Sequence, residues 1–287
     1  MMIVSRTPLR VSFFGGGTDY PEYFERARGA VLGMAIDKYT YITALTLPPV
    51  LDYKYRVTYS KTESVSSVDE IEHPVVREAL RFYKVAEPLH ISTMTNLPSR
   101  SGLASSSSFT VGLLNLLAAL QGRTQTKFDL ARAAVFVERE LLGENVGVQD
   151  PFHTAFGGLN RFDFEKGRTR ITPVQMTATT QEALASSLFL VHSGATRFAS
   201  ETLPEQIEKT KTGAVDRELS HLLELVDRGV DALESDDPGA MLAAFGAMLH
   251  EGWETKKRLS SKVSNPAIDA IYDRARAAGA LGGKLCG

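Results

Sequence analysis

A loop rich in serine and glycine, residues 97–108, separates a predicted strand from a predicted helix. The loop reads LPSRSGLASSSS; the strand covers residues 89–95 and the helix covers residues 106–120. Small side chains let a ligand approach the backbone closely, and the start of a helix offers N–H groups without intrahelical partners. The arrangement therefore favours an anion site, most naturally for phosphate groups. A flexible polar linker, or a plain helix cap with spare serines, is the alternative at this point.

The order of the predicted elements indicates an α+β fold. Residues 31–47 and 53–59 alternate as strands and are predicted to form an antiparallel pair across the turn at Pro48-Pro49. Further elements are predicted as helices at 74–85 and 127–142 and as strands at 159–164, 170–174 and 188–192. Residues 200–278 are almost wholly helical, with new helices at Asp237-Pro238 and Asn265-Pro266. Strands first and helices last are typical of α+β rather than alternating βαβ units.

The net charge and the cysteine content limit the partners and the compartment that we expect for this protein. The 32 Lys+Arg and 34 Asp+Glu residues leave a net charge of −2, which gives no general reason to bind nucleic acid or an anionic membrane. The single cysteine, Cys286, excludes an intramolecular disulfide and favours a reducing compartment. The longest apolar stretch, residues 111–120, is too short to cross a membrane, and no secretory signal is read at the start. We expect a cytoplasmic protein without nucleic-acid or membrane partners.

Two carboxylates downstream of the loop suit phosphoryl transfer. Glu138 lies within the predicted helix 127–142, and Asp150 follows a glycine-containing turn. Transfer of a phosphoryl group to an alcohol needs metal ligands at the nucleotide and often a carboxylate that takes the hydroxyl proton. The alternatives are a surface ion pair for Glu138 and an ordinary helix cap for Asp150, which precedes Pro151.

The N-terminal segment is a strand that runs into three glycines, Gly15 to Gly17. Arg10 lies among apolar neighbours, where burial would require a carboxylate or phosphate partner. Asp19 follows the glycines and could accept hydrogen bonds from sugar hydroxyls. A tight hairpin, with Arg10 in solvent and Asp19 in a local turn bond, is the alternative. Gly283-Lys284 is followed by Leu285, so the segment is not a P-loop. The serine loop does not match the G-x-S-x-G elbow either.

Taken together, these segments resemble the GHMP kinases. The loop matches the second motif of that family, P-x-x-x-G-L-x-S-S, from Pro98 to Ser106. The segment from Pro8 to Tyr20 resembles the first motif of galactokinases. Gly147-Val148-Gln149-Asp150 resembles the segment that carries the catalytic aspartate of sugar kinases, and residues 279–287 resemble the opening of the third, glycine-rich motif.

The resemblance implies a fold and a set of roles. The fold would join an N-terminal half like ribosomal protein S5, with a β-α-β unit, to a ferredoxin-like C-terminal half, with domains at 1–180 and 181–287. Asp150 would be the catalytic base, with Arg10 beside it to stabilise charge. Ser106 and Glu138 would ligate Mg²⁺. ATP would be bound by Pro98, Arg100, Ser101, Gly102, Leu103, Ala104, Ser105, Ser106 and Ser107.

Within this family, the sequence resembles most the branch that contains the D-glycero-α-D-manno-heptose 7-phosphate kinases and their L-fucokinase relatives. Galactokinases place Glu-His where Gly16-Gly17 stand here, which leaves room for a larger sugar. The expected reaction phosphorylates the anomeric hydroxyl of heptose 7-phosphate, with L-fucose as an alternative acceptor. Gly16, Gly17 and Asp19 would contact the sugar, and its phosphate would meet Arg197, Lys256 and Lys257. For these three cations, a solvated helix face is the alternative.

Two departures from the family pattern carry expectations of their own. Pro151 stands where the family has Gln, and it removes a backbone donor beside Asp150. The printed chain stops at Gly287, inside the expected third motif, so the C-terminal domain is expected to be incomplete, with ATP binding kept and turnover poor. A sensor of sugar or nucleotide that keeps the fold without turnover is therefore a further alternative. The oligomeric state stays open, with a dimer among the options.

Overall fold

The computed structural model describes residues 1–98, 101–194 and 199–286, and for residues 199–203 the backbone only. The chain forms two compact units that alternate along the sequence. Unit 1 comprises Met1–Arg10, Ala35–Val146 and Asp150–Gly157. Unit 2 comprises Val11–Met34, Gly147–Gln149 and Gly158–Gly287. Because the units interleave, neither coincides with the range 1–180 or 181–287, and that domain boundary stays a prediction.

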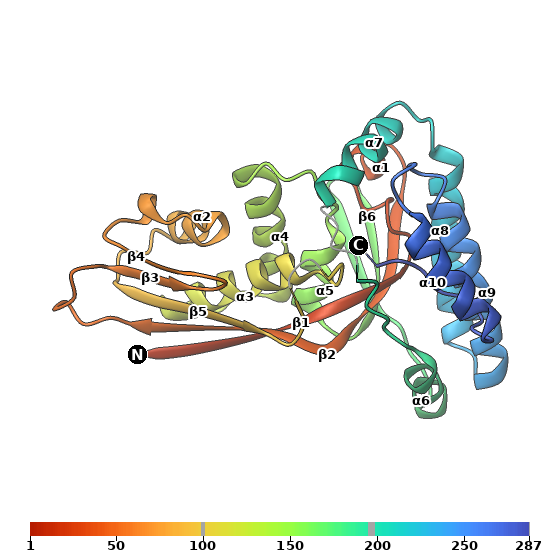
Figure 1. The fold of residues 1–287 in the computed structure, drawn as a ribbon, viewed down its shortest axis with the longest axis horizontal. Helices are drawn as coiled ribbons and strands as arrows, with labels where there is room; N and C mark the ends of the chain where they lie inside the picture. The colour runs from red at the N-terminus through yellow and green to blue at the C-terminus, as the bar shows by residue number, and fades with distance from the viewer. Residues whose placement is uncertain (99–100, 195–198, 287) are drawn as a thin grey trace. The chain divides into compact units, whose positions relative to one another are not determined.

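The elements follow the order shown in Figure 1. The strands are β1 (Met2–Phe14), β2 (Gly29–Thr46), β3 (Tyr55–Thr58), β4 (Thr62–Val65), β5 (Leu89–Thr95), β6 (Leu159–Glu165) and β7 (Arg168–Pro173). The helices up to β6 are α1 (Pro21–Phe24), the 3₁₀ turn η1 (Val68–Glu70), α2 (Pro74–Tyr83), α3 (Ser105–Leu120), α4 (Lys127–Phe136), the π-helical turn η2 (Val137–Leu141) and α5 (Gln149–Phe156). After β7 come α6 (Ala178–Ser187), α7 (Ala199–Lys211), α8 (Asp216–Leu233), α9 (Pro238–Lys256) and α10 (Pro266–Ala277).

The sheet of unit 1 corrects one predicted pairing. Residues 40–46 of β2 pair antiparallel with β5, β5 pairs parallel with β3, and β3 pairs antiparallel with β4. The strands predicted at 31–47 and 53–59 do form, but they are not partners, because β5 occupies the edge of β2 that β3 was expected to use. Local alternation identifies a strand, whereas its hydrogen-bonding partner is set by segments far along the chain.

The core of unit 1 lies between this sheet and helices α2 and α3. Ile42, Ile91, Leu80 and Leu114 are among its fully buried side chains. At Gly112 of α3 an added Cβ would lie 2.6 Å from Thr7 Oγ1, so a glycine is needed where α3 crosses β1. The predicted helix 127–142 forms, and its last turn is the π-helical η2.

In unit 2 the residues 29–34 of β2 pair antiparallel with β6, and β6 pairs antiparallel with β7. Helices α8 and α9 lie side by side and share a core with β1 and β2 (Figure 1). In this core the rings of Phe13 and Phe14 at the end of β1 each meet Phe245 of α9 edge-on, with 5.0 Å between centroids.

The helix starts predicted in unit 2 are confirmed, and one strand is not. Asp237 caps α9 and Asn265 caps α10, each by accepting a backbone N–H with its side chain. The strand predicted at 188–192 does not form. Leu188 packs against the core of unit 2, but Phe189 and Val191 are 84% and 69% exposed, so the alternating apolar pattern does not bury one face. The combination of a mixed sheet with these helices confirms the α+β class.

Candidate active site

The start of α3 in unit 1 has no side-chain cap at its N-cap residue, Ala104. Gly102 has φ 73°, and Ala104, the residue before the helix, has the left-handed values φ 62° and ψ 35°. Alanine has no side chain that can cap a helix, and among the described residues no serine of the loop takes over this cap. A residue other than glycine is held in this region at a cost of about 1–3 kcal/mol, which is typical of ligand-binding loops. The geometry thus favours the anion site over a plain cap.

Arg10 connects this loop to the candidate base. Its Nε and Nη2 lie 2.8 and 2.7 Å from Asp150 Oδ1, and its Nη1 donates to the carbonyl of Gly102 at 2.8 Å. The backbone N–H of Arg10 also donates to the carbonyl of Leu103 at 3.1 Å. Only 5% of Arg10 is exposed, which rules out the solvent-facing alternative. A planar guanidinium has enough donors in fixed directions to hold both groups, which a lysine does not.

Asp150 lies in the first turn of α5, where the proline at position 151 removes no backbone hydrogen bond of the helix. The amides of a first helical turn have no intrahelical acceptor, so the missing N–H of proline removes no helix bond there. The carbonyl of Asp150 accepts a hydrogen bond from Thr154 Oγ1 at 2.9 Å. The side chain of Asp150 is 28% exposed. Asp150 is therefore a partly accessible carboxylate fixed by a buried arginine, which is more than the ordinary cap weighed from the sequence.

Glu138 is a buried carboxyl group on η2. It is 2% exposed, and its Oε2 accepts a hydrogen bond from Ser107 Oγ at 3.0 Å. Its Oε1 is buried and has no hydrogen-bond partner among the described residues. Burial, only partly opposed by the Ser107 bond, raises the pKa of Glu138 to about 8, and the nearby Asp150 charge adds to the rise. This environment excludes the surface ion pair considered from the sequence.

The donor set around Glu138 fits a magnesium ion shared with a nucleotide. The described residues contain no group of three or more His, Cys, Asp or Glu side chains suited to a metal. Magnesium needs no such cage, because it binds through one or two protein oxygens together with phosphates and water. The unpartnered Oε1 of Glu138 is an anionic oxygen of the required kind. The hydroxyl beside it belongs to Ser107, whereas Ser106 is exposed and accepts a bond from Thr110 through its carbonyl.

Asp19 is fully buried in unit 2, and its carboxylate holds the backbone. Its Oδ1 accepts from the amide of Gly17 at 3.0 Å, and its Oδ2 accepts from the amide of Gln149 at 3.2 Å. An added Cβ at Gly147 would lie 2.0 Å from Oδ2, so only glycine allows this approach. Asp19 therefore joins the triple-glycine turn to the segment 147–149. Its burial does not support the predicted direct contact with a sugar hydroxyl.

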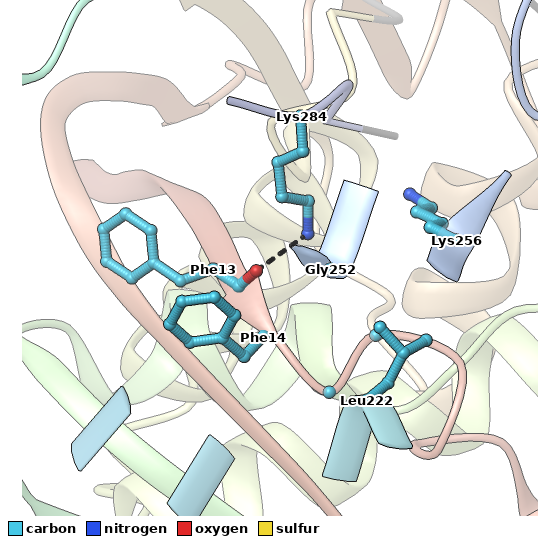
Figure 2. A pocket seen from close by; sticks show the side chains of 8 residues that line it. Phe13, Phe14, Leu222, Gly252, Lys256 and Lys284 are labelled. Carbon is cyan, nitrogen blue, oxygen red and sulfur yellow. Dashed lines mark hydrogen bonds between the residues drawn. The ribbon is translucent and has the colours of Figure 1, made fainter. Parts of the chain in front are cut away.

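The other residues predicted to contact the sugar lie in different environments. Gly16 and Lys256 line one pocket of unit 2, shown in Figure 2. Gly17 has φ 108° and serves the turn. Lys257 forms an ion pair with Glu254 at 2.7 Å and lies over the Trp253 ring, which supports the solvated-face alternative for this lysine. The predicted residues Arg100 and Arg197 lie outside the described residues.

Sequence reasoning overlooked three side chains near these positions. Lys284 lines the same pocket as Lys256, although the sequence placed it only in a glycine-rich segment. Ser12 and Gln149 each have a buried oxygen without a partner among the described residues. The glycines around Lys284 were the available signal, because they allow the close backbone packing that positions it.

Comparisons with known proteins agree with the geometry. Residues 71–158 match the family described as GHMP kinases N terminal domain, and residues 240–287 match GHMP kinases C terminal. The first match includes the loop, Glu138 and Asp150, and the second includes Lys256 and Lys284. No helix in the described part of the chain is long and apolar enough to span a membrane.

Relatives match over nearly the whole chain. A D-glycero-alpha-D-manno-heptose 7-phosphate kinase of Campylobacter jejuni is 28% identical over 99% of this chain and 86% of its own. A bifunctional fucokinase/GDP-fucose pyrophosphorylase of Arabidopsis thaliana is 23% identical over 93% of this chain and 27% of its own. The crystal structure of a D-glycero-D-manno-heptose 1-phosphate kinase from Bacteroides thetaiotaomicron is 25% identical, with a TM-score of 0.72 over 100% of this chain and 86% of the other. The fold and the two family matches agree, and the chain is similar to the GHMP kinases in both its N-terminal and its C-terminal part.

Proposed function

We propose that this protein is an ATP- and Mg²⁺-dependent sugar kinase that phosphorylates the C1 hydroxyl of D-glycero-α-D-manno-heptose 7-phosphate. The product would be the 1,7-bisphosphate. The observation that carries the proposal is the buried Arg10, which binds both Asp150 and the carbonyl of Gly102 in the phosphate loop. A candidate base and a candidate phosphate site are thereby fixed to one guanidinium within unit 1.

The chemistry follows from these contacts. The C1 hydroxyl oxygen attacks the γ-phosphorus of ATP, its proton passes to Asp150, and the bond from the γ-phosphorus to the β-phosphate oxygen breaks to release ADP. Arg10 keeps the Asp150 carboxylate in one orientation, and the amides at the start of α3 bind phosphate oxygens. Positioning and charge stabilisation supply most of the acceleration in phosphoryl transfer, and both come here from fixed groups.

Magnesium would be held by Glu138 together with a serine hydroxyl of the first turn of α3. When bound, the ion supplies positive charge that screens the phosphate oxygens. Ser107 is the serine that contacts Glu138, while Ser106 is the one that aligns with the family motif. Without the ion, Glu138 would carry an unsatisfied buried oxygen, which is costly to keep.

The phosphorylated heptose is supported by the names of two relatives. The C. jejuni and B. thetaiotaomicron proteins are both named as kinases of a heptose phosphate, although the phosphate is at position 7 in one name and at position 1 in the other. The fucokinase named in the A. thaliana relative keeps L-fucose as the second candidate acceptor. A catalytically silent sensor is less well supported, because Asp150, Arg10 and Glu138 keep catalytic surroundings.

The test is ATP consumption by the full chain with a panel of acceptors. The panel contains heptose 7-phosphate, heptose 1-phosphate, unphosphorylated heptose, L-fucose and galactose, each with Mg²⁺ and with EDTA. We expect turnover with heptose 7-phosphate to exceed that with unphosphorylated heptose at least about tenfold, because a charge-assisted contact to phosphate contributes about 1.5–3 kcal/mol. A preference for fucose would reject the substrate, and no turnover with any acceptor would favour the sensor.

A further inference from the structure

In unit 1, side chains of α4 and η2 hold the segment that carries Asp150. At the start of α4, Lys127 Nζ donates to the carbonyl of Phe156, the last residue of α5, at 2.7 Å. The rings of Phe128 and Phe152 meet edge-on, with 5.8 Å between centroids. These two contacts hold the middle and the end of α5, whereas Asp150 lies in its first turn.

Arg139 makes the contact on the other side of Asp150. Its Nη1 donates to the carbonyl of Val146, and three residues separate Val146 from Asp150. The carbonyl of Glu138 also accepts from the amide of Glu144, at 3.0 Å. The turn between the two carboxylates is thus tied back to η2 at two points, by consecutive residues.

The two consecutive residues lie in the π-helical turn. The amide of Leu142 donates to the carbonyl of Val137 at 3.0 Å, five residues back instead of the four of an α-helix. Such turns are rare in helices and occur frequently at functional sites. Here one residue of the turn, Glu138, provides the buried carboxylate of the candidate metal site, and the next, Arg139, reaches the turn before the candidate base.

The backbone before Asp150 has little else in unit 1 to fix it. Arg10 binds one carboxylate oxygen of Asp150, Oδ1, at the tip of the side chain. The residues 143–145 of the preceding turn are exposed, so packing contributes little to their position. Hydrogen bonds from a charged donor are stronger than neutral ones, and the bond from Arg139 is of this kind.

We propose that Arg139 is a positioning residue for phosphoryl transfer, which fixes the turn before Asp150 relative to the carboxylate of Glu138. The inference rests on the proposed function, because it takes Asp150 as the group that accepts the hydroxyl proton. Arg139 touches no reacting atom in this assignment and acts through Asp150 alone. A displacement of about 1 Å at a reacting group can cost about 100-fold in rate, so such a tie matters for turnover.

The main experiment is a double-mutant cycle of Arg139→Met with Asp150→Asn. It measures kcat with Mg-ATP and the acceptor that the wild type uses best. Arg139→Met alone should lower kcat about tenfold or more and change the KM values less than about twofold. In the Asp150→Asn background it should lower kcat less than about twofold, because the base through which Arg139 acts is already absent. A merely structural role would lower kcat by the same factor in both backgrounds.

Two measures keep the cycle interpretable. Arg132→Met removes an exposed arginine of the same helix and should leave kcat unchanged. The number of ADP sites per chain, from calorimetry, gives the folded fraction, so that kcat refers to folded protein only. If Arg139→Met binds no ADP, Arg139→Lys, which keeps the positive charge, takes its place in the cycle.

A second readout needs neither metal nor nucleotide. Endoproteinase Glu-C cleaves after glutamate, and Glu144 is exposed in the turn that Arg139 holds. Loss of a hydrogen bond from a charged donor should raise the population of the open turn, and with it the rate of cleavage after Glu144, about tenfold. Arg132→Met should be cleaved at the wild-type rate. Equal cleavage of wild type and Arg139→Met would overturn the tie between Arg139 and the turn.

The outcomes distinguish this inference from the proposed function. An unchanged kcat of Arg139→Met, or equal losses in both backgrounds, would overturn the positioning role and leave the proposed function standing. Near-normal turnover of Asp150→Asn would overturn the base and the positioning role together, with kinase activity still observed. A wild type without turnover on any acceptor would overturn the proposed function itself.

Discussion

The candidate catalytic site of unit 1 and the pocket of unit 2 differ in the charged residues that line them. In unit 1 the arginine and aspartate are held together, at 2.7 Å, with 5% of Arg10 exposed. In unit 2 two cations line one pocket with no acidic residue among its lining. A charge fixed by its partner can keep one orientation through a reaction. We therefore expect substitutions in unit 1 to change turnover.

The largest expected effect tests the catalytic half of this comparison. Asp150→Asn should lower kcat about 100-fold or more, because an amide cannot take the hydroxyl proton, while ATP and sugar affinities change little. Steady-state kinetics and calorimetry give the two readouts. Asp69→Asn, at an exposed carboxylate of the same unit, is the control. Near-normal turnover of Asp150→Asn would remove the aspartate from the mechanism.

The next prediction concerns the glycine that packs against Asp19. Gly147→Ala should destabilise the protein by about 1–3 kcal/mol, the usual cost of overpacking, because its Cβ would lie 2.0 Å from a fully buried carboxylate oxygen. Urea or thermal unfolding measures the loss. The matched variant is Gly16→Ala, whose Cβ meets only ordinary contacts and should leave stability unchanged. Equal stability of the two variants would mean that the Asp19 contact is looser than the structure indicates.

A smaller effect is expected at the buried carboxyl of unit 1. Glu138→Gln should raise the Mg²⁺ concentration for half-maximal rate roughly tenfold, because the ion loses an anionic oxygen. An unchanged Mg²⁺ requirement would make Glu138 a structural residue.

The role of Glu138 can also be tested without measuring turnover, from the thermal stability of the metal-free protein. Its pKa is raised from 4.5 to about 8 in the folded protein, so its contribution to stability is present below pH 4.5 and is lost as the pH rises through 8. Glu138→Gln avoids that loss and should have the higher Tm at pH 9 in EDTA. Added Mg²⁺ should stabilise wild type more than the variant.

The smallest expected effect is at a partly exposed carboxylate of unit 2. Hydrogen bonds from Lys209 and from the hydroxyl and amide groups of Ser260 and Ser261 lower the pKa of Glu205 to about 2. A lowered pKa stabilises the fold above the unfolded value near 4.5, and this contribution is lost as the pH falls through about 2. Glu205→Gln should therefore lower the Tm slightly at pH 7 and by progressively less below pH 4.5. A Tm difference that stays constant with pH would show that the charge of Glu205 is not involved.

The sequence predicted unit 1 better than unit 2 for a physical reason. The loop, Glu138 and Asp150 lie in motifs to which the family resemblance assigns ATP binding and proton transfer, and kinases with different acceptors share these needs. Lys284, Ser12 and Gln149 meet only through folding, so no local pattern marks them as neighbours. The pairing of β2 with β5 was missed for the same reason, because periodicity reports the face of a strand and not its partner. The π-helical turn at Glu138 was also not predicted, because the spacing of apolar residues in 127–142 indicates only an ordinary α-helix.

The alternation of the two units along the chain affects how such proteins can diversify. β1 passes from one unit to the other between Arg10 and Val11, and β2 does so between Met34 and Ala35. Neither unit is a continuous stretch of the sequence, so no single crossover between two related genes can exchange one unit whole. A recombinant joined within the first 34 residues would inherit strands whose packing partners evolved in different parents.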